Sequence, residues 1–368
     1  MDYKNLDTPA LIIDYDIMID NLKKMQKYAD KENVKLRPHT KTHKMPRVAK
    51  MQEEYGAKGI AVAKVEEAEV MAKFGLKDIF IANEIVGSKK LHRIRKLAEN
   101  IDITFGIDSV EQCKMIEEVF EGAKKRAQVL VEIEVGENRS GIIEMDDFLD
   151  LLEYIGSSNN IYLNGIFSHD GHSYKAKSMS EVKKIHLESQ KQTLEFANCA
   201  QREGLYLETV SIGSTPSLIN DLPILEGVTE IRPGTYVFMD AAQGLGYGSL
   251  AMNAASILTT VISKPTIMRV ITDVGAKGLT MQRRDVGITK TKGLGLIKGF
   301  PNSQIDSVFD EHAIIYDEEI SEKVKIGDTL EIIPNHICPV VNLYDEAYFV
   351  QNGKVIEVVK IECRGKMK

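Results

Sequence analysis

Short apolar segments rich in β-branched residues alternate with helical patterns through the first two-thirds of the chain. Most are separated by stretches whose apolar residues recur with the period of about 3.6 residues that is typical of amphipathic helices, for example 66–74, 89–97, 110–119, 148–155 and 181–200. The strand-like segments are eight in number: 34–36, 59–63, 78–82, 103–106, 128–133, 161–167, 209–212 and 228–231. Eight strands alternating with helices favour a closed barrel over an open sheet. We therefore predict an α/β protein with a (β/α)8 TIM-type barrel over roughly residues 20–250.

The pattern changes after about Ala255, where helical periodicity becomes weak. Turns such as Asn352-Gly353 separate strand-like segments at 256–263, 267–272, 314–315, 329–333 and 354–361. We predict a mostly β domain over residues 251–368. A further strand at residues 8–14 precedes the barrel, and we expect residues 1–19 to join this β domain.

Composition narrows the class of protein. A chain of 368 residues is long enough for a barrel and an accessory domain. The net charge of -7 gives no support to a nucleic-acid or membrane partner. No apolar run reaches membrane-spanning length, and the N-terminus lacks the apolar core of a signal peptide. The four cysteines are widely scattered, so we expect a reduced, cytoplasmic protein without a disulfide framework.

The segment 35–44 combines a strand end with a cluster of basic residues. Pro38 cannot donate to a central ladder, so it ends the short strand. His39, Lys41 and His43 follow, at the end of a strand where barrels place their chemistry. A lysine there can form a Schiff base if desolvation or neighbouring cations lower its pKa. A solvated basic turn is the alternative.

Polar residues also follow four later strands, at 136–141, 168–174, 213–217 and 232–236. Turn composition explains each one separately, but a barrel would gather them on one face. Gly213-Ser214-Thr215 and Gly234-Thr235 suit a phosphate, because glycine lets the backbone approach and hydroxyl and N–H groups donate. A lysine at one strand and a phosphate cradle at the last two match a pyridoxal phosphate site. Tight loops without a ligand are the alternative.

His336 and Cys338 form a second candidate site. If this segment is a strand, residues two apart face the same side and could hold one ion. Imidazole and thiolate suit zinc, and two protein ligands would leave positions for water or substrate. A buried cysteine beside a hydrogen-bonded histidine is the alternative.

The segment Arg37–Lys44 resembles the lysine motif of the D-threonine aldolase and D-serine dehydratase family. These are pyridoxal-phosphate enzymes of the alanine-racemase-like fold type III. The resemblance extends over most of the chain, through residues 7–11, 83–87, 131–141, 171–174, 232–240 and 334–343. It implies pyridoxal 5'-phosphate and a divalent metal, with zinc favoured over manganese or magnesium. It also implies a homodimer that acts on a small D-amino acid substrate.

The resemblance assigns roles residue by residue. Lys41 would bind the cofactor as a Schiff base, Arg139 would approach its phenolic oxygen, and Arg232 would lie near its ring nitrogen. The other implied residues are His169 against the pyridine ring, Tyr174 as a catalytic residue beside Lys41 and His169, Ser214, Thr215, Gly234 and Thr235 at the phosphate, and His336 and Cys338 at the metal. Arg37, His39, His43 and Lys44 would lower the pKa of Lys41 by like-charge repulsion.

The implied activity is that of a lyase on D-β-hydroxy amino acids. Removal of the Cα proton leads to elimination, giving a 2-oxo acid and ammonia. Deprotonation of the β-hydroxyl leads instead to cleavage into glycine and an aldehyde. The family's aldolases tend to have aspartate where this chain has Cys338, which favours a dehydratase over a D-threonine aldolase. An amino-acid racemase is a further alternative and would need a second base, for which Tyr344 and Tyr348 are candidates. A non-enzymatic carrier of pyridoxal phosphate would leave the C-terminal domain unexplained.

Overall fold

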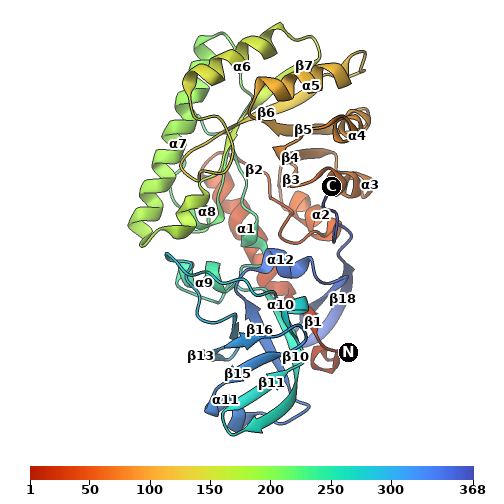
Figure 1. The fold of residues 1–368 in the computed structure, drawn as a ribbon, viewed down its shortest axis with the longest axis vertical. Helices are drawn as coiled ribbons and strands as arrows, with labels where there is room; N and C mark the ends of the chain where they lie inside the picture. The colour runs from red at the N-terminus through yellow and green to blue at the C-terminus, as the bar shows by residue number, and fades with distance from the viewer.

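The structure is a computed structural model that describes all residues, 1–368. Its longest axis runs through two parts, with the barrel above the β domain in Figure 1. The barrel sheet has eight strands in the order β2-β9-β8-β7-β6-β5-β4-β3, every neighbouring pair parallel. All eight predicted strands are present: β2 (Lys35–Leu36), β3 (Ile60–Val62), β4 (Asp78–Glu84), β5 (Asp102–Ile107), β6 (Ala127–Ile133), β7 (Ile161–Ser168), β8 (Thr209–Ile212) and β9 (Glu230–Ile231).

Hydrogen bonds of Ala61 close the barrel between β2 and β3. The Ala61 N–H donates to the Pro38 carbonyl at 2.8 Å, and the Ala61 carbonyl accepts from the Thr40 N–H at 2.8 Å. His39 forms an isolated parallel bridge with Ala61. Because Pro38 lacks an N–H, it can take part only as an acceptor. The prediction of an α/β barrel is confirmed.

Helices cover the outside of the barrel, and the sequence accounts for where some of them begin. The Asp14 carboxylate accepts from the Ile17 N–H at 3.1 Å and caps α1. Pro46 occupies the first turn of α2, where its missing N–H costs no hydrogen bond. The helices of this part are α1 (Tyr15–Lys31), α2 (Pro46–Glu54), α3 (Val65–Lys73), α4 (Ser88–Ala98), α5 (Val110–Phe120), α6 (Met145–Ser157), α7 (Met179–Arg202), α8 (Thr215–Leu218) and α9 (Ala241–Tyr247), with the 3-10 turns η2 (Gly171–Lys175) and η3 (Thr235–Val237). None of the helices in the chain is both long and apolar enough to cross a bilayer.

The second part is a β domain. Its central path runs β13-β12-β16-β10-β1-β17-β18, and β11 connects β10 to β15, which pairs with β14. Its strands are β1 (Ala10–Asp14), β10 (Ala255–Thr266), β11 (Arg269–Thr272), β12 (Gly295–Ile297), β13 (Phe300–Gln304), β14 (Ser307–Val308), β15 (Ala313–Tyr316), β16 (Thr329–Pro334), β17 (Glu346–Gln351) and β18 (Lys354–Lys360); its helices are η1 (Tyr3–Asn5), α10 (Ala276–Leu279), α11 (Glu318–Lys323) and α12 (Ile337–Val341). Strands β12, β13, β14 and β17 were not predicted from the sequence. Strands β12 and β14 have only three and two residues, and β13 contains Pro301, so none of the three has the length and apolar alternation of a typical strand.

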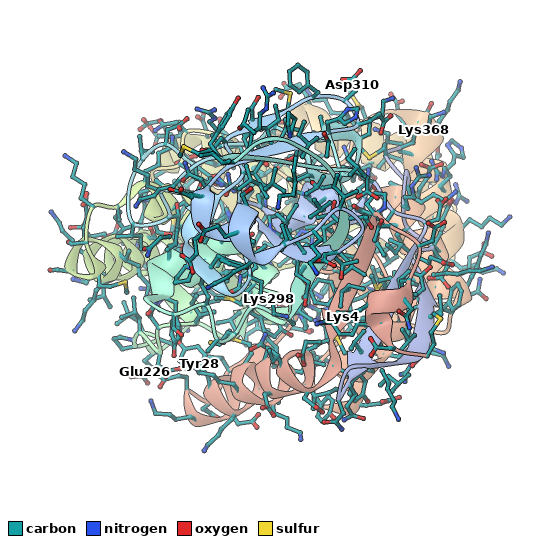
Figure 2. The ribbon with its side chains drawn as sticks, turned by 90° about the horizontal axis from the view of Figure 1, so that it is seen from below. Lys4, Tyr28, Glu226, Lys298, Asp310 and Lys368 are labelled. Atoms are coloured by element: carbon teal, nitrogen blue, oxygen red, sulfur yellow. The ribbon has the colours of Figure 1, made fainter.

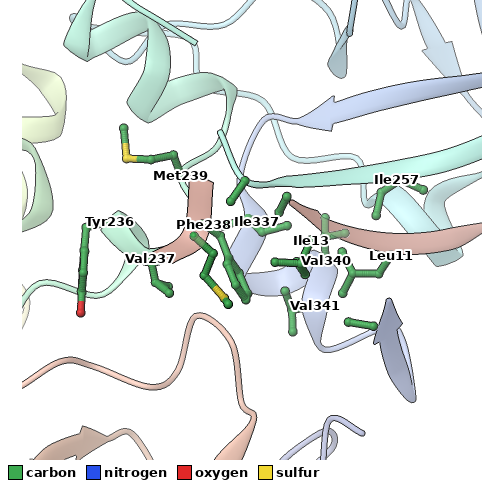
Figure 3. Packing of buried hydrophobic residues seen from close by; sticks show 14 of the residues in the cluster. Leu11, Ile13, Tyr236, Val237, Phe238, Met239, Ile257, Ile337, Val340 and Val341 are labelled. Carbon is green, nitrogen blue, oxygen red and sulfur yellow. The ribbon is translucent and has the colours of Figure 1, made fainter. Parts of the chain in front are cut away.

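Strand β1 lies inside the sheet of the β domain. It is antiparallel to β10, with Ile12 opposite Ser256, and parallel to β17, with Ile12 opposite Tyr348. Its side chains alternate between two hydrophobic clusters. Leu11 and Ile13 belong to the larger one, which also contains Val340. Figure 3 shows this cluster, where β1, η3 and α12 meet. Figure 2, seen from the β-domain end, shows α1 along one side of the molecule, with Tyr28 labelled.

The strand expected at His336 and Cys338 is not present. Strand β16 ends at Pro334, His336 is the N-cap of α12, and Cys338 lies within that helix. Pro339 explains the difference, because proline is accepted in the first helical turn but cannot donate to a ladder. The alternation of a strand therefore does not position these two side chains.

Candidate active site

A cavity of about 880 Å³ opens where the C-terminal ends of the barrel strands meet the β domain. It is lined by nearly all of the residues singled out from the sequence: Lys41, Arg139, His169, Tyr174, Thr215, Arg232, Gly234, Thr235, His336 and Cys338. Ser214 is the exception. It is buried just behind the lining, with its Oγ 3.1 Å from the Ser173 Oγ. The fold thus brings together residues that are up to about 300 positions apart, as the C-terminal face of a barrel does.

Lys41 follows β2, and its side chain lines this cavity. The Thr40 hydroxyl donates to the Ala61 carbonyl at 3.1 Å and fixes the loop. Burial among surrounding protein atoms lowers the pKa of Lys41, and Arg139 and Arg232 lower it further, although Cys338 opposes them. A lowered pKa increases the neutral amine, which is the form that can act as a nucleophile or base.

The cations that lower the pKa of Lys41 differ from those expected. Arg37 is turned away, with its Nε 2.7 Å from a Glu230 oxygen. The Lys44 ammonium lies 2.6 Å from a Glu67 oxygen. The His43 imidazole is buried, with its Nε2 3.2 Å from the Gln52 Oε1. None of Arg37, His43 and Lys44 lines the cavity, so their contacts support the loop. Of the expected set only His39 lines the cavity.

Arg232 presents a free donor to the cavity. Its Nη2 donates to the Ser168 carbonyl at 2.7 Å, and its guanidinium lies over the Phe167 ring at 5.1 Å. Burial lowers its pKa to about 10. Its Nη1 is buried without a hydrogen-bond partner. A buried donor that lines a cavity calls for an acceptor from a ligand, and a pyridine nitrogen fits that need.

The loops that contain Gly213 and Gly234 allow other groups to approach the backbone closely. The Gly234 N–H donates to the Thr215 hydroxyl at 3.2 Å and joins the loops after β8 and β9. A Cβ added at Gly234 would lie 3.1 Å from the Thr42 Oγ1. A Cβ at Gly213 would lie 2.7 Å from the His169 Nδ1, so that imidazole packs directly on the backbone. These contacts fit a cradle for a flat, phosphorylated ligand.

Two carboxylates, Glu132 and Glu137, form ion pairs with Arg139, and this pairing was not found from the sequence. The Arg139 Nη2 lies 3.2 Å from the Glu132 Oε1, and the Ser140 hydroxyl donates to the other Glu132 oxygen at 2.8 Å. Burial raises the pKa of Glu84 to about 8, and a hydrogen bond with Glu132 raises it too. A glutamate within the apolar run of β6 was the available signal.

His336 and Cys338 lie against the lysine loop. The Cys338 sulfur is 3.3 Å from the Thr42 hydroxyl and 3.7 Å from that of Thr235. The His336 Nδ1 is 3.0 Å from the Gln282 Oε1. Burial lowers the pKa of His336 to about 4, so the imidazole is neutral near pH 7, as a metal ligand must be. No group of three or more His, Cys, Asp or Glu side chains is arranged to hold a metal, so this pair would leave coordination positions open.

Three tyrosines were candidates for catalysis, and one lines the cavity. Burial raises the pKa of Tyr174, so its phenol is protonated near pH 7. Its ring lies under the Arg284 guanidinium at 5.6 Å. The Tyr344 hydroxyl donates to the Gly278 carbonyl at 2.9 Å, and that of Tyr348 to Glu346 at 2.7 Å. Neither lines the cavity, so this chain offers no second base for a racemase at those positions.

A barrel followed by a β domain, with a lysine after an early strand facing such a cavity, defines the class of fold-type III pyridoxal-phosphate enzymes. Residues 13–242 match the profile described as "Alanine racemase, N-terminal domain", and residues 254–350 match the "Putative serine dehydratase domain". The chain belongs to the D-threonine aldolase and D-serine dehydratase family. It is a pyridoxal-phosphate-dependent lyase.

Individual relatives cover the whole length. The chain is 31% identical to the D-threonine aldolase of Arthrobacter sp over 98% of this chain and 93% of that protein. The crystal structure of D-threonine aldolase from Filomicrobium marinum superposes with a TM-score of 0.89 at 30% identity, covering 99% of this chain and 96% of that one. D-threo-3-hydroxyaspartate dehydratase from Delftia sp. HT23 superposes with a TM-score of 0.88 at 28% identity, covering 97% of each chain.

Proposed function

We propose that the protein is a metal-assisted dehydratase of D-β-hydroxy amino acids such as D-serine and D-threonine. The observation that carries this proposal is the contact between the Cys338 sulfur and the Thr42 hydroxyl, which sets the candidate metal pair beside Lys41. Two similar structures of a D-threo-3-hydroxyaspartate dehydratase are mutants, one with alanine at a histidine and the other with alanine at a cysteine two positions further on. The cysteine mutant is described as metal-free. His336 and Cys338 have the same spacing, which supports elimination over retro-aldol cleavage.

The cavity residues fit both groups. Lys41 would bind pyridoxal phosphate, with Arg232 at its ring nitrogen and Arg139 at its phenolic oxygen, His169 beside its ring, and Ser214, Thr215, Gly234 and Thr235 around its phosphate. When bound, it supplies an electron sink for charge at Cα. A divalent metal on His336 and Cys338 supplies a Lewis acid at the β-hydroxyl.

The chain's own residues move the protons. The neutral Lys41 amine removes the Cα proton, because burial keeps a fraction of it unprotonated. The Cβ–O bond then breaks, and the hydroxyl leaves as water after taking up a proton. Tyr174, held protonated by burial, is the donor that we assign to this step. The remaining unsaturated amine rearranges to an imine, and water hydrolyses it to a 2-oxo acid and ammonia.

D-threonine aldolase activity is the second candidate, because relatives of that name match nearly the full length. Cleavage would need a base at the β-hydroxyl in place of one at Cα. The chemical difference between the two reactions therefore lies in which proton is removed first. Amino-acid racemase activity is less favoured, since Tyr344 and Tyr348 lie outside the cavity.

Products from D-threonine separate these activities. Elimination yields 2-oxobutanoate and ammonia, retro-aldol cleavage yields glycine and acetaldehyde, and inversion at Cα by a racemase yields L-allothreonine. Glycine as the main product would overturn the dehydratase proposal. Activity that persists after removal of metal by a chelator would overturn the role of His336 and Cys338. We also propose a homodimer, which light scattering coupled to gel filtration tests.

A further inference from the structure

Arg284 is an arginine of the cavity that has no carboxylate partner. It comes from the β domain and forms no ion pair in the structure, although it lines the cavity. Its Nε is buried without a hydrogen-bond partner, and its Nη2 lies 3.2 Å from the His336 Nδ1. Its guanidinium lies over the Tyr174 ring. A guanidinium consists of donors only, so this arrangement leaves it short of acceptors.

The segment that carries Arg284 is fixed to the barrel side of the cavity. The Thr291 N–H donates to the Arg284 carbonyl at 2.9 Å, and the Thr289 hydroxyl donates to the Tyr174 carbonyl at 2.8 Å. Gly287 has a φ of 72°, and a Cβ there would lie 2.6 Å from the Lys175 backbone. This close approach requires glycine. Arg284 is thus held in position before any ligand binds.

The contacts of His336 further reduce the hydrogen-bond acceptors available to Arg284. Its Nδ1 lies within hydrogen-bond distance of both the Gln282 Oε1 and the Arg284 Nη2, at 3.0 Å and 3.2 Å. The Nε2 has no protein partner. If the Nε2 lone pair binds a metal, the ring proton must be on Nδ1, which then donates to Gln282. Arg284 then faces an N–H group and loses its acceptor.

We propose that Arg284 binds a carboxylate of the substrate beside the candidate metal pair, an inference that rests on the proposed lyase function. Guanidinium and carboxylate form two parallel hydrogen bonds, so such a contact fixes orientation as well as charge. The carboxylate has two sources: the α-carboxylate of every amino acid, or the side-chain carboxylate of a β-hydroxy dicarboxylic substrate. The neighbouring Arg283 also lines the cavity but contacts neither His336 nor Tyr174, which makes it a matched control.

Binding of D-alanine and D-aspartate tests this without turnover, because neither carries the β-hydroxyl that both reactions need. Their dissociation constants are measured on the cofactor-loaded protein from the change in cofactor absorbance, for wild type, Arg284→Gln and Arg283→Gln. We expect Arg284→Gln to weaken binding by about 10-fold or more, as loss of a charged hydrogen bond does. Equal weakening for both ligands identifies the α-carboxylate, and weakening for D-aspartate alone identifies the side-chain carboxylate.

Three outcomes would overturn the proposal. One is unchanged affinity for both ligands in Arg284→Gln. Another is an equal loss in Arg283→Gln, which would indicate a diffuse positive field. The third is a fall in bound metal, measured by atomic absorption, in proportion to the lost affinity, which would show that Arg284 acts through His336. If the wild type binds both ligands but forms no 2-oxobutanoate from D-threonine, the dehydratase proposal is refuted. The proposed contact of Arg284 with a carboxylate is not refuted by that result.

Discussion

The Thr42 hydroxyl lies 3.3 Å from the Cys338 sulfur, although 296 residues separate them in the sequence. Thr42 follows Lys41 directly, so this contact ties the loop of the candidate cofactor lysine to the candidate metal pair. The lysine comes from the barrel and the cysteine from α12 of the β domain. The relative position of the two parts therefore determines the distance between cofactor and metal.

Lys41→Ala should abolish the visible absorbance of a lysine–cofactor Schiff base and reduce activity by about 10³-fold or more, because both nucleophile and base are lost. Absorbance spectra and product assays measure this. Lys44→Met is the matched control. It removes a lysine three positions away whose ammonium is paired with Glu67, so it should retain the absorbance and lose stability instead. An unchanged spectrum in Lys41→Ala would contradict the assignment.

His336→Ala and Cys338→Ala should each lose bound metal while keeping the Schiff-base absorbance, because the two sites use different side chains. Metal content by atomic absorption and the cofactor spectrum test the two parts separately. Cys199→Ala, which removes a buried thiol on α7, controls for the loss of a cysteine. Full metal content in both site variants would show that the ion binds elsewhere.

Arg37→Ala should destabilise the fold by about 3–5 kcal/mol, since it leaves the buried Glu230 carboxylate without its cation. Urea denaturation measures the change in the free energy of unfolding. Arg47→Ala provides the comparison, because its ion pair with Glu357 is largely exposed and should contribute less than about 1 kcal/mol. Similar losses in both variants would show that burial of the Arg37 ion pair does not increase its contribution to the free energy of unfolding.

The stability of the wild type relative to Glu84→Gln should fall as pH rises from about 5 to 8. Folding raises the pKa of Glu84 from 4.5 to about 8, so the folded state holds its proton more tightly. Stability is then lost as pH rises through this interval. Because the group is partly exposed, we expect a difference of about 2 kcal/mol. Urea denaturation at several pH values tests this, with the exposed Glu99→Gln as control for a lost carboxylate. A constant difference would refute it.

The barrel could be predicted because most of its strands lie in short apolar segments rich in β-branched residues, and most of these segments are separated by helical patterns. Strand β17, which follows helix α12, was not predicted although Ala347 and Phe349 are buried in alternation. Pro339 was the available signal for that helix. Strand β13, with Pro301 and Asn302, has no such signal, because its pairing with β12 is what makes it a strand.

The candidate site was predictable where residues follow barrel strands, as Lys41, Arg139 and Arg232 do. Glu84 and Arg284 could not be found in this way. The pKa of Glu84 depends on Glu132, two strands away, and Arg284 reaches the cavity only because its segment is fixed to Tyr174. Such roles depend on tertiary proximity, which a single sequence does not contain.

The position of β1 between β10 and β17 has a consequence for the order in which the chain is made. All eight strands of the barrel have been synthesised once the chain reaches residue 231. In contrast, β1 leaves the ribosome early and must wait for residues 255–266 and 346–351 before its sheet can form. Domains can fold as units during synthesis. The barrel can therefore fold first, while β1 remains unpaired. The cavity is completed only when α12 packs against the barrel and β1.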